Sequence, residues 1–139
     1  MELAKNFSDK SYTKIEAMKF SMELERRILD LKLRNSIILA RDEHNDNIIG
    51  AGSLSVFIDF IGNTHAILHQ VITHADYAFK KGIEEEIIRE ILKYIKNSLK
   101  IENAGFLLLE NHPHKSQYLS LLMKLGFKKS NFSFYEVKL

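Results

Sequence analysis

The alternation of apolar and polar residues divides the first half of the chain into helical and extended segments. Residues 11–34 carry apolar side chains at helical spacings, which predicts one helix or two shorter ones. Three apolar-rich segments follow, separated by the turn residues 43–47 and 62–63: 36–42, 48–59 and 65–74. Three strands joined by short turns predict an antiparallel meander.

The second half of the chain has a different pattern. A stripe of isoleucines predicts a helix over residues 81–98. Residues 105–109 are apolar throughout, which is typical of a strand that is internal to a sheet and covered on both faces. Strand, helix and strand form a βαβ unit. Pro113 predicts the first position of the next helix and Gly126 its end, and the alternating residues 132–139 predict a final strand.

Together these elements predict an α/β (α+β) fold in a single domain over residues 1–139. Its mixed central sheet would consist of an antiparallel N-terminal meander followed by the βαβ unit, with helices on both faces. The 139 residues suit one hydrophobic core, and a content of 45% hydrophobic and 27% charged residues is that of an ordinary soluble domain.

Composition and charge exclude several classes of function. The 20 basic and 18 acidic residues are interspersed and give a net charge of +2, so we expect no nucleic-acid partner. The absence of cysteine excludes disulfides, thiolate nucleophiles and cysteine-based zinc sites. Scattered histidines give no set of ligands that converges on one point, so we expect no metal. No apolar segment resembles a signal peptide or a membrane span, and we expect a cytoplasmic protein with no membrane partner.

The order of the elements resembles that of the GNAT superfamily of acyl-CoA-dependent N-acyltransferases. The resemblance covers about residues 36–139 and is most specific at residues 121–129, where Gly-Phe follows a helix and precedes a strand. It implies a GNAT-like fold, acetyl-CoA as co-substrate and direct attack by an amine of a small molecule or protein. A catalytically inactive GNAT-like binding or adaptor module is the alternative, and a homodimer is compatible with either.

The resemblance also implies a cofactor loop between the third strand and the following helix. The positions that would bind the cofactor lie in and around residues 71–84: Ile72, Thr73, His74, Phe79, Lys80, Lys81, Gly82, Ile83, Glu84 and Asn111. Unpaired N–H groups and the dipole at a helix start attract a pyrophosphate where small residues let it approach. The Lys80-Lys81 pair can contact phosphates, or it is a solvated helix start.

Three positions in this loop depart from the family pattern and motivate the alternative function. Phe79 stands where the family has a basic residue or glutamine, and Lys80 and Glu84 stand where it has glycines. Residues 84–86 place three carboxylates in the first helical turn. At about 100° per residue, Glu84 shares the face of the isoleucine stripe, so we expect its side chain to point towards the apolar face.

Acyl transfer to an amine requires a base and a group that protonates the departing thiolate. His74 and Glu110 lie near the carboxyl ends of two strands that we infer to be parallel neighbours, and they are candidate general bases. Tyr118 is the candidate acid by resemblance, although it lies one turn before the family's tyrosine position, which is Leu122 here.

Two structural interpretations of these polar residues remain open. A strand histidine is often a hydrogen-bonded surface residue, and residues 110–114 can be a polar loop that caps a helix. Strict alternation would place His65, His69 and Thr73 on one face of their strand and Gln70 and His74 on the other.

Overall fold

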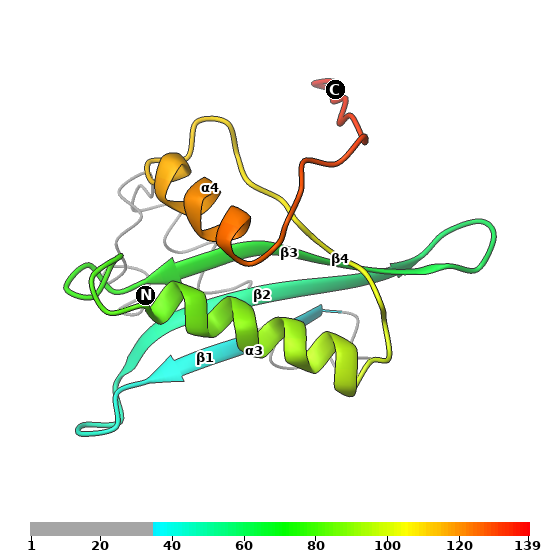
Figure 1. Cartoon of the computed structure of the whole chain (residues 1–139). Coiled ribbons are helices and arrows are strands. Elements are labelled where there is room, and N and C mark those ends of the chain that lie inside the picture. The colour runs from blue at the N-terminus through cyan, green and yellow to red at the C-terminus, as the bar shows by residue number, and fades with distance from the viewer. Residues whose placement is uncertain (1–34) are drawn as a thin grey trace.

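A four-stranded mixed sheet forms the centre of the computed structural model, which describes residues 35–139 (Figure 1). The helices predicted before residue 35 lie outside this range. The elements, in chain order, are β1 (Asn35–Arg41), β2 (Ile48–Ile58), β3 (Thr64–Thr73), α3 (Ile83–Asn97), β4 (Ala104–Phe106) and α4 (Lys115–Lys124). The strand order is β1-β2-β3-β4, with antiparallel pairing among the first three and parallel pairing of β3 with β4. The predicted meander followed by a βαβ unit is confirmed.

Helix α3 lies across one face of the sheet and contacts β1, β2 and β3 (Figure 1). Its buried residues form one stripe: Ile83, Glu84, Ile87, Ile88, Ile91 and Ile95. Gly50 and Gly52 of β2 face this stripe, and a Cβ atom on Gly52 would lie 2.6 Å from side-chain atoms of both Ile87 and Ile91. The absence of side chains at these two positions therefore lets α3 pack directly against the backbone of β2.

Strand β3 contains a bulge. Gln70 pairs with Ser53 and Leu68 with Leu54, so His69 is an extra residue between them. The His69 ring interacts with the hydroxyls of Ser53 and Ser55, whereas Thr73 pairs with Gly50 on the face that α3 covers. The expectation that His69 and Thr73 share a face is wrong, because the bulge shifts the alternation by one residue.

The C-terminal part of the chain departs most from the predictions. β4 ends at Phe106 and is an edge strand of the described sheet, and Leu107 and Leu109 are exposed; the prediction of a fully covered internal strand is therefore wrong. Helix α4 begins at Lys115, two residues after Pro113, so proline does not occupy its first position. Gly126 follows the helix with a φ of 89°, as expected of a C-terminal glycine. Residues 132–139 form no strand.

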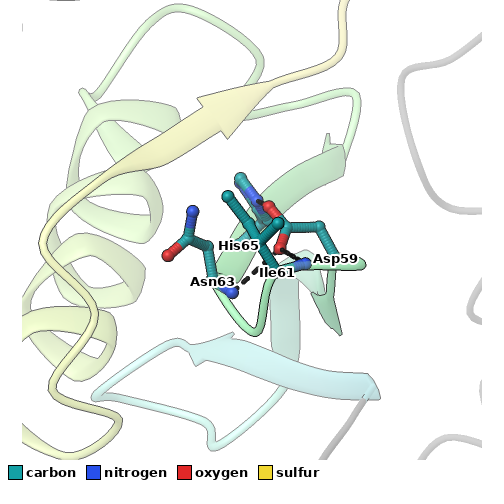
Figure 2. A network of polar contacts seen from close by, with 4 residues as sticks. All are labelled: Asp59, Ile61, Asn63 and His65. Carbon is teal, nitrogen blue, oxygen red and sulfur yellow. Dashed lines mark hydrogen bonds and ion pairs between the residues drawn. The ribbon is translucent and has the colours of Figure 1, made fainter.

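The turn between β2 and β3 is braced by one carboxylate (Figure 2). Asp59 accepts hydrogen bonds from the amides of Ile61 (3.0 Å) and Asn63 (2.9 Å), and its other oxygen lies 2.8 Å from Nε2 of His65. These contacts lower the pKa of Asp59 below its ordinary value, and the hydrogen bond with His65 contributes most. The turn is therefore held by a side chain that mimics backbone pairing.

The packing of α3 on β2 generates a stability prediction. Gly52→Val should lower the free energy of unfolding by about 1–3 kcal/mol, because the new side chain must displace Ile87 and Ile91. Gly105→Ala is the matched control, since a Cβ there would meet only one atom, at 3.9 Å. Chemical denaturation of both variants tests the packing, and equal stability of Gly52→Val and the parent chain would contradict it.

Candidate active site

Strands β3 and β4 lie side by side only over a short stretch. Their pairing runs from Ala66 with Ala104 to Leu68 with Phe106, and the amide of Leu107 then donates to the carbonyl of Leu68 at 2.8 Å. β3 continues to Thr73, whereas β4 has ended. The last part of β3 therefore has one edge that β4 does not pair.

Val71 presents its backbone groups to this unpaired edge. The amide of His74 donates to the carbonyl of Ile49 on β2 at 2.8 Å, and alternation then directs Ile72 towards β2 and Val71 away from it. Consistent with this, the hydroxyl of Tyr118 donates to the carbonyl of Val71 at 2.8 Å. The N–H of Val71 points to the same edge, where no backbone carbonyl beyond the end of β4 accepts it among residues 35–139. Such an amide can stabilise negative charge on a ligand oxygen.

Tyr118 is held in place by aromatic neighbours. Its ring centroid lies 5.0 Å from that of Phe79, 5.2 Å from that of His112 and 5.9 Å from that of Phe106. The first two contacts are edge-to-face, the geometry that ring quadrupoles favour. Phe79 also lies 5.3 Å from His114. The cluster joins the loop before α3, the turn before α4 and α4 itself around one buried phenol.

The start of α3 has the geometry of an anion site. Gly82 is the N-cap residue, with a φ of 70° and no side-chain cap, and the amides of the first helical turn lack partners within the helix. A Cβ atom on Gly82 would meet no atom within 4 Å. A left-handed backbone favours glycine here, and the space in front of it is open.

The three carboxylates that follow have different surroundings. Glu84 is 2% exposed, and its Oε2 accepts the amide of Phe79 at 3.1 Å, so its predicted direction is confirmed. Glu85 pairs with Lys124 at 2.8 Å and with Arg89 at 3.4 Å, and Lys124 above all lowers the pKa of Glu85. Only Glu86 is exposed among the three. Of the three carboxylates, therefore, only that of Glu85 is offset by neighbouring cations within residues 35–139.

The two lysines of the loop are both exposed. Nζ of Lys81 lies 5.0 Å from the ring centroid of Tyr77, within the range of a cation–π contact. The Tyr77 hydroxyl donates to Asp42 at 2.9 Å, and this hydrogen bond raises the pKa of Tyr77. The loop is thus tied to the turn between β1 and β2.

The two candidate bases contact different groups. Nδ1 of His74 accepts the amide of Asp76 at 3.2 Å. Glu110 is exposed and bonded to Lys115, which lowers the pKa of the Glu110 carboxyl and weakens it as a base. Asn111 is exposed in the turn that follows Glu110.

The remaining candidates, Ile72 and Thr73, lie at the end of β3. Ile72 packs with Ala51 on the face away from α3. Thr73 is 1% exposed on the α3 face, and its Oγ1 has no hydrogen-bond partner within the described chain. A buried hydroxyl without a partner is unusual and adds a second unpaired polar group at this end of β3.

Sequence reasoning missed Val71 as part of the site. Val71 looks like an ordinary core residue, and only the bulge at His69 and the bond from Tyr118 reveal its orientation. No group of three or more His, Cys, Asp or Glu side chains in residues 35–139 is arranged to hold a metal ion. Within the same range, no helix combines the length and apolar character that a bilayer span requires.

Comparison with solved structures identifies the fold. A transcriptional regulator from Bacillus halodurans C-125 matches with a TM-score of 0.72 at 16% identity, over 99% of this chain and 91% of that chain. A ribosomal-protein-alanine N-acetyltransferase from Brucella melitensis biovar Abortus 2308 matches with a TM-score of 0.66 at 15% identity, over 85% of this chain and 79% of that chain. A GNAT family acetyltransferase from Staphylococcus aureus matches with a TM-score of 0.64 at 14% identity, over 88% of this chain and 77% of that chain.

No protein-family model matches the sequence, and a search of curated proteins finds no match. The chain has a GNAT-like fold, shared with acetyltransferases of that superfamily.

The contact between Glu84 and Phe79 generates a prediction about the loop. Glu84→Ala should speed hydrogen exchange of the Phe79 amide and lower the free energy of unfolding by about 1–3 kcal/mol, because a part-buried donor loses its acceptor. Glu86→Ala, in the same helical turn but exposed, should change stability by no more than about 0.5 kcal/mol. Indistinguishable exchange in the two variants would show that Glu84 does not brace the loop.

Proposed function

We propose that this chain is a GNAT-type N-acyltransferase that transfers an acetyl group from acetyl-CoA to an amine of a small molecule or protein. The observation that carries the proposal is the unpaired edge of β3, where the Val71 N–H and the Tyr118 hydroxyl lie on the same edge and the Tyr118 ring contacts Phe79 of the loop that leads to the uncapped start of α3. The fold shared with acetyltransferases supports the same assignment.

The donor would be held by main-chain groups at the start of α3. The amides around Gly82 would bind the diphosphate of CoA, and Lys80 and Lys81 would add positive charge. The pairing of Glu85 with Lys124 offsets one of the negative charges beside this point. Oγ1 of Thr73, near the end of β3, is a further polar group for which residues 35–139 supply no hydrogen-bond partner.

The reaction would be a direct transfer. The neutral amine attacks the thioester carbonyl, negative charge develops on the carbonyl oxygen, and the N–H of Val71 stabilises it. Collapse of this intermediate forms the amide bond and breaks the carbon–sulfur bond. The thiolate takes a proton from Tyr118, whose hydroxyl lies at the same edge. The amine loses one proton as the amide forms, so the total number of protons is unchanged.

His74 is the better of the two candidate bases. Glu110 is exposed and paired with Lys115, so its pKa is lowered and it accepts protons poorly. His74 directly follows β3 and is part-buried, at the carboxyl end where ligands bind in open α/β sheets. We therefore assign proton removal from the amine to His74.

A non-catalytic GNAT-like module is the second candidate function, and two observations favour it. The carboxylate of Glu84 takes up the amide of Phe79, which is then not available to a phosphate. The Phe79 ring, packed on Tyr118, also replaces the basic residue expected at this position. In that case the domain would bind a partner without turning over acyl-CoA.

Binding of CoA separates the two functions. CoA or acetyl-CoA at 100 times its dissociation constant should stabilise the chain by about 2.7 kcal/mol, measured as a rise in Tm. Gly82→Asp should abolish the rise, because the new carboxylate would cap the amides that the diphosphate needs. Gly82→Ala introduces the same strain in the left-handed backbone but no charge, so this variant should retain most of the rise in Tm. No rise in Tm with either ligand would favour the non-catalytic module.

Thiol release from acetyl-CoA with a panel of amines tests the role of Tyr118. Tyr118→Phe removes the hydroxyl and should lower kcat by about 10²- to 10⁴-fold, the usual contribution of a general acid. Tyr135→Phe, at an exposed tyrosine, is the control and should leave kcat unchanged. If Tyr118→Phe keeps kcat within a factor of about two, Tyr118 does not supply the proton.

A further inference from the structure

The hairpin of β2 and β3 extends beyond the rest of the sheet. β1 pairs with β2 only as far as Ser55, and β4 pairs with β3 only from Ala66 onwards. Within residues 35–139, the strand segments 56–58 and 64–65 therefore pair only with each other. In Figure 1 the turn that joins them reaches past the end of α3 and past β4. The fold thus presents a narrow two-stranded projection at this end of the sheet.

The end of this projection, residues 57–63, is apolar and is here called the hairpin tip. Its four large apolar side chains have exposed fractions from 47% to 110%: Phe57, Ile58, Phe60 and Ile61. Between residues 53 and 64 the one charged residue is Asp59. Soluble domains rarely leave so many neighbouring apolar side chains in water, so the hairpin tip is expected to have a binding partner.

The hairpin tip is held in shape by the one charge that it contains. The Asp59 carboxylate accepts the amides of Ile61 and Asn63 (Figure 2). It also contacts His65, whose ring stacks on that of Phe57 with centroids 4.9 Å apart. The apolar side chains consequently project from an ordered turn, and the single charge near them already has hydrogen-bond partners.

Three exposed lysines lie at the same end of the molecule as the hairpin tip. α3 runs back along the sheet from the end of β3, so its last turn approaches the end at which β4 begins (Figure 1). Residues 91–104 cover this part of α3 and lead into β4. They contain one acidic residue, Glu102, and three lysines, all exposed: Lys93, Lys96 and Lys100. This end of the molecule therefore carries an excess of positive charge behind the apolar tip.

We propose that the hairpin tip inserts into the surface of a lipid bilayer that contains anionic lipids, while Lys93, Lys96 and Lys100 contact the headgroups. Apolar side chains backed by lysines are the combination that binds peripheral proteins to such surfaces. The expectation of no membrane partner concerned spans and signal peptides, and peripheral contact of this kind requires neither. The proposal does not depend on the acyltransferase assignment.

The dimensions of the projection suit this mode of binding. Asn63 lies three residues before Ala66, the level at which β4 begins, so the hairpin tip reaches roughly 10 Å beyond that level. An apolar segment at a membrane interface is buried by about 5–10 Å. Insertion to that depth would bring residues 100–104 close to the headgroups, where the long side chains of lysines can contact phosphates.

A second copy of the chain fits the hairpin tip less well. Specific protein–protein interfaces use about 20–30 residues from each partner, whereas the tip has seven, residues 57–63. A lipid surface imposes no such minimum, because a few inserted side chains and the attraction of nearby cations act together. A symmetric contact between two tips would also bring like charges towards each other.

Cosedimentation with lipid vesicles tests the proposal. The parent chain should bind vesicles of phosphatidylcholine that contain about 30% phosphatidylserine, and it should bind pure phosphatidylcholine at least about tenfold more weakly. The reason is that each lysine near an anionic surface strengthens binding about fivefold. A parent chain that binds neither vesicle, or both equally well, would overturn the proposal.

Substitutions in the hairpin tip test its insertion. Phe60→Ser combined with Ile61→Ser should weaken vesicle binding at least about tenfold, because two apolar side chains no longer enter the bilayer. Both side chains are exposed, so this variant should keep the Tm of the parent chain. Phe132→Ser combined with Phe134→Ser removes two similarly exposed side chains outside the tip and should bind as the parent does.

Charge reversal tests the lysines separately. Lys96→Glu combined with Lys100→Glu should weaken binding to the phosphatidylserine vesicles at least about tenfold. Lys80→Glu combined with Lys81→Glu changes the net charge equally at the other end of α3, more than a Debye length of about 10 Å away, and should weaken binding less than about threefold.

The proposal is refuted if the tip variant or the Lys96–Lys100 variant binds the anionic vesicles as tightly as the parent chain. Sedimentation of the full chain without lipid covers the remaining partner. A dimer that Phe60→Ser with Ile61→Ser dissociates would assign the hairpin tip to a second copy instead of a bilayer.

Discussion

The site depends on where the backbone groups of β3 find hydrogen-bond partners after β4 has ended. A buried carbonyl without a partner costs about 1–3 kcal/mol, so the carbonyl of Val71 needs a donor. Tyr118 supplies one from α4, 47 residues further along the chain. This bond joins α4 to the unpaired edge without adding a strand to it. As a consequence, the N–H of Val71 remains directed at the edge while the sheet around it stays ordered.

The position of α3 follows from a second constraint, the absence of side chains on one face of β2. Gly50 and Gly52 let Ile87 and Ile91 reach the strand backbone, and this contact sets the distance between helix and sheet. The helix start at Gly82 is thereby fixed near the end of β3, and Glu84 ties it to the loop through the Phe79 amide. A hydrophobic contact in the core thus positions a polar site at the surface.

The elements that the sequence predicts well are those whose pattern is local. The meander and α3 have clear periods of two and 3.6 residues, and the same periodicity placed Glu84 on the buried face. The orientation of Val71 was not predictable, because it follows from a bulge at His69 and a bond from a distant helix. β4 was misread because apolar composition alone does not distinguish a covered strand from an edge strand. Residues 132–139 have a strand pattern but pair with no strand of the part of the chain that the structure describes.

The unpaired polar groups at the end of β3 favour a ligand over a purely structural role for this region. The N–H of Val71, the Oγ1 of Thr73 and the uncapped amides after Gly82 each reduce stability when nothing binds them. A serine or aspartate at position 82 would place a side-chain acceptor at the helix start, but it would strain the left-handed backbone and fill the open space in front of the helix. Unsatisfied donors that gather at one place are typical of functional sites, where a ligand supplies the missing acceptors. Because most of these groups are donors, they suit a ligand that is rich in acceptor oxygens.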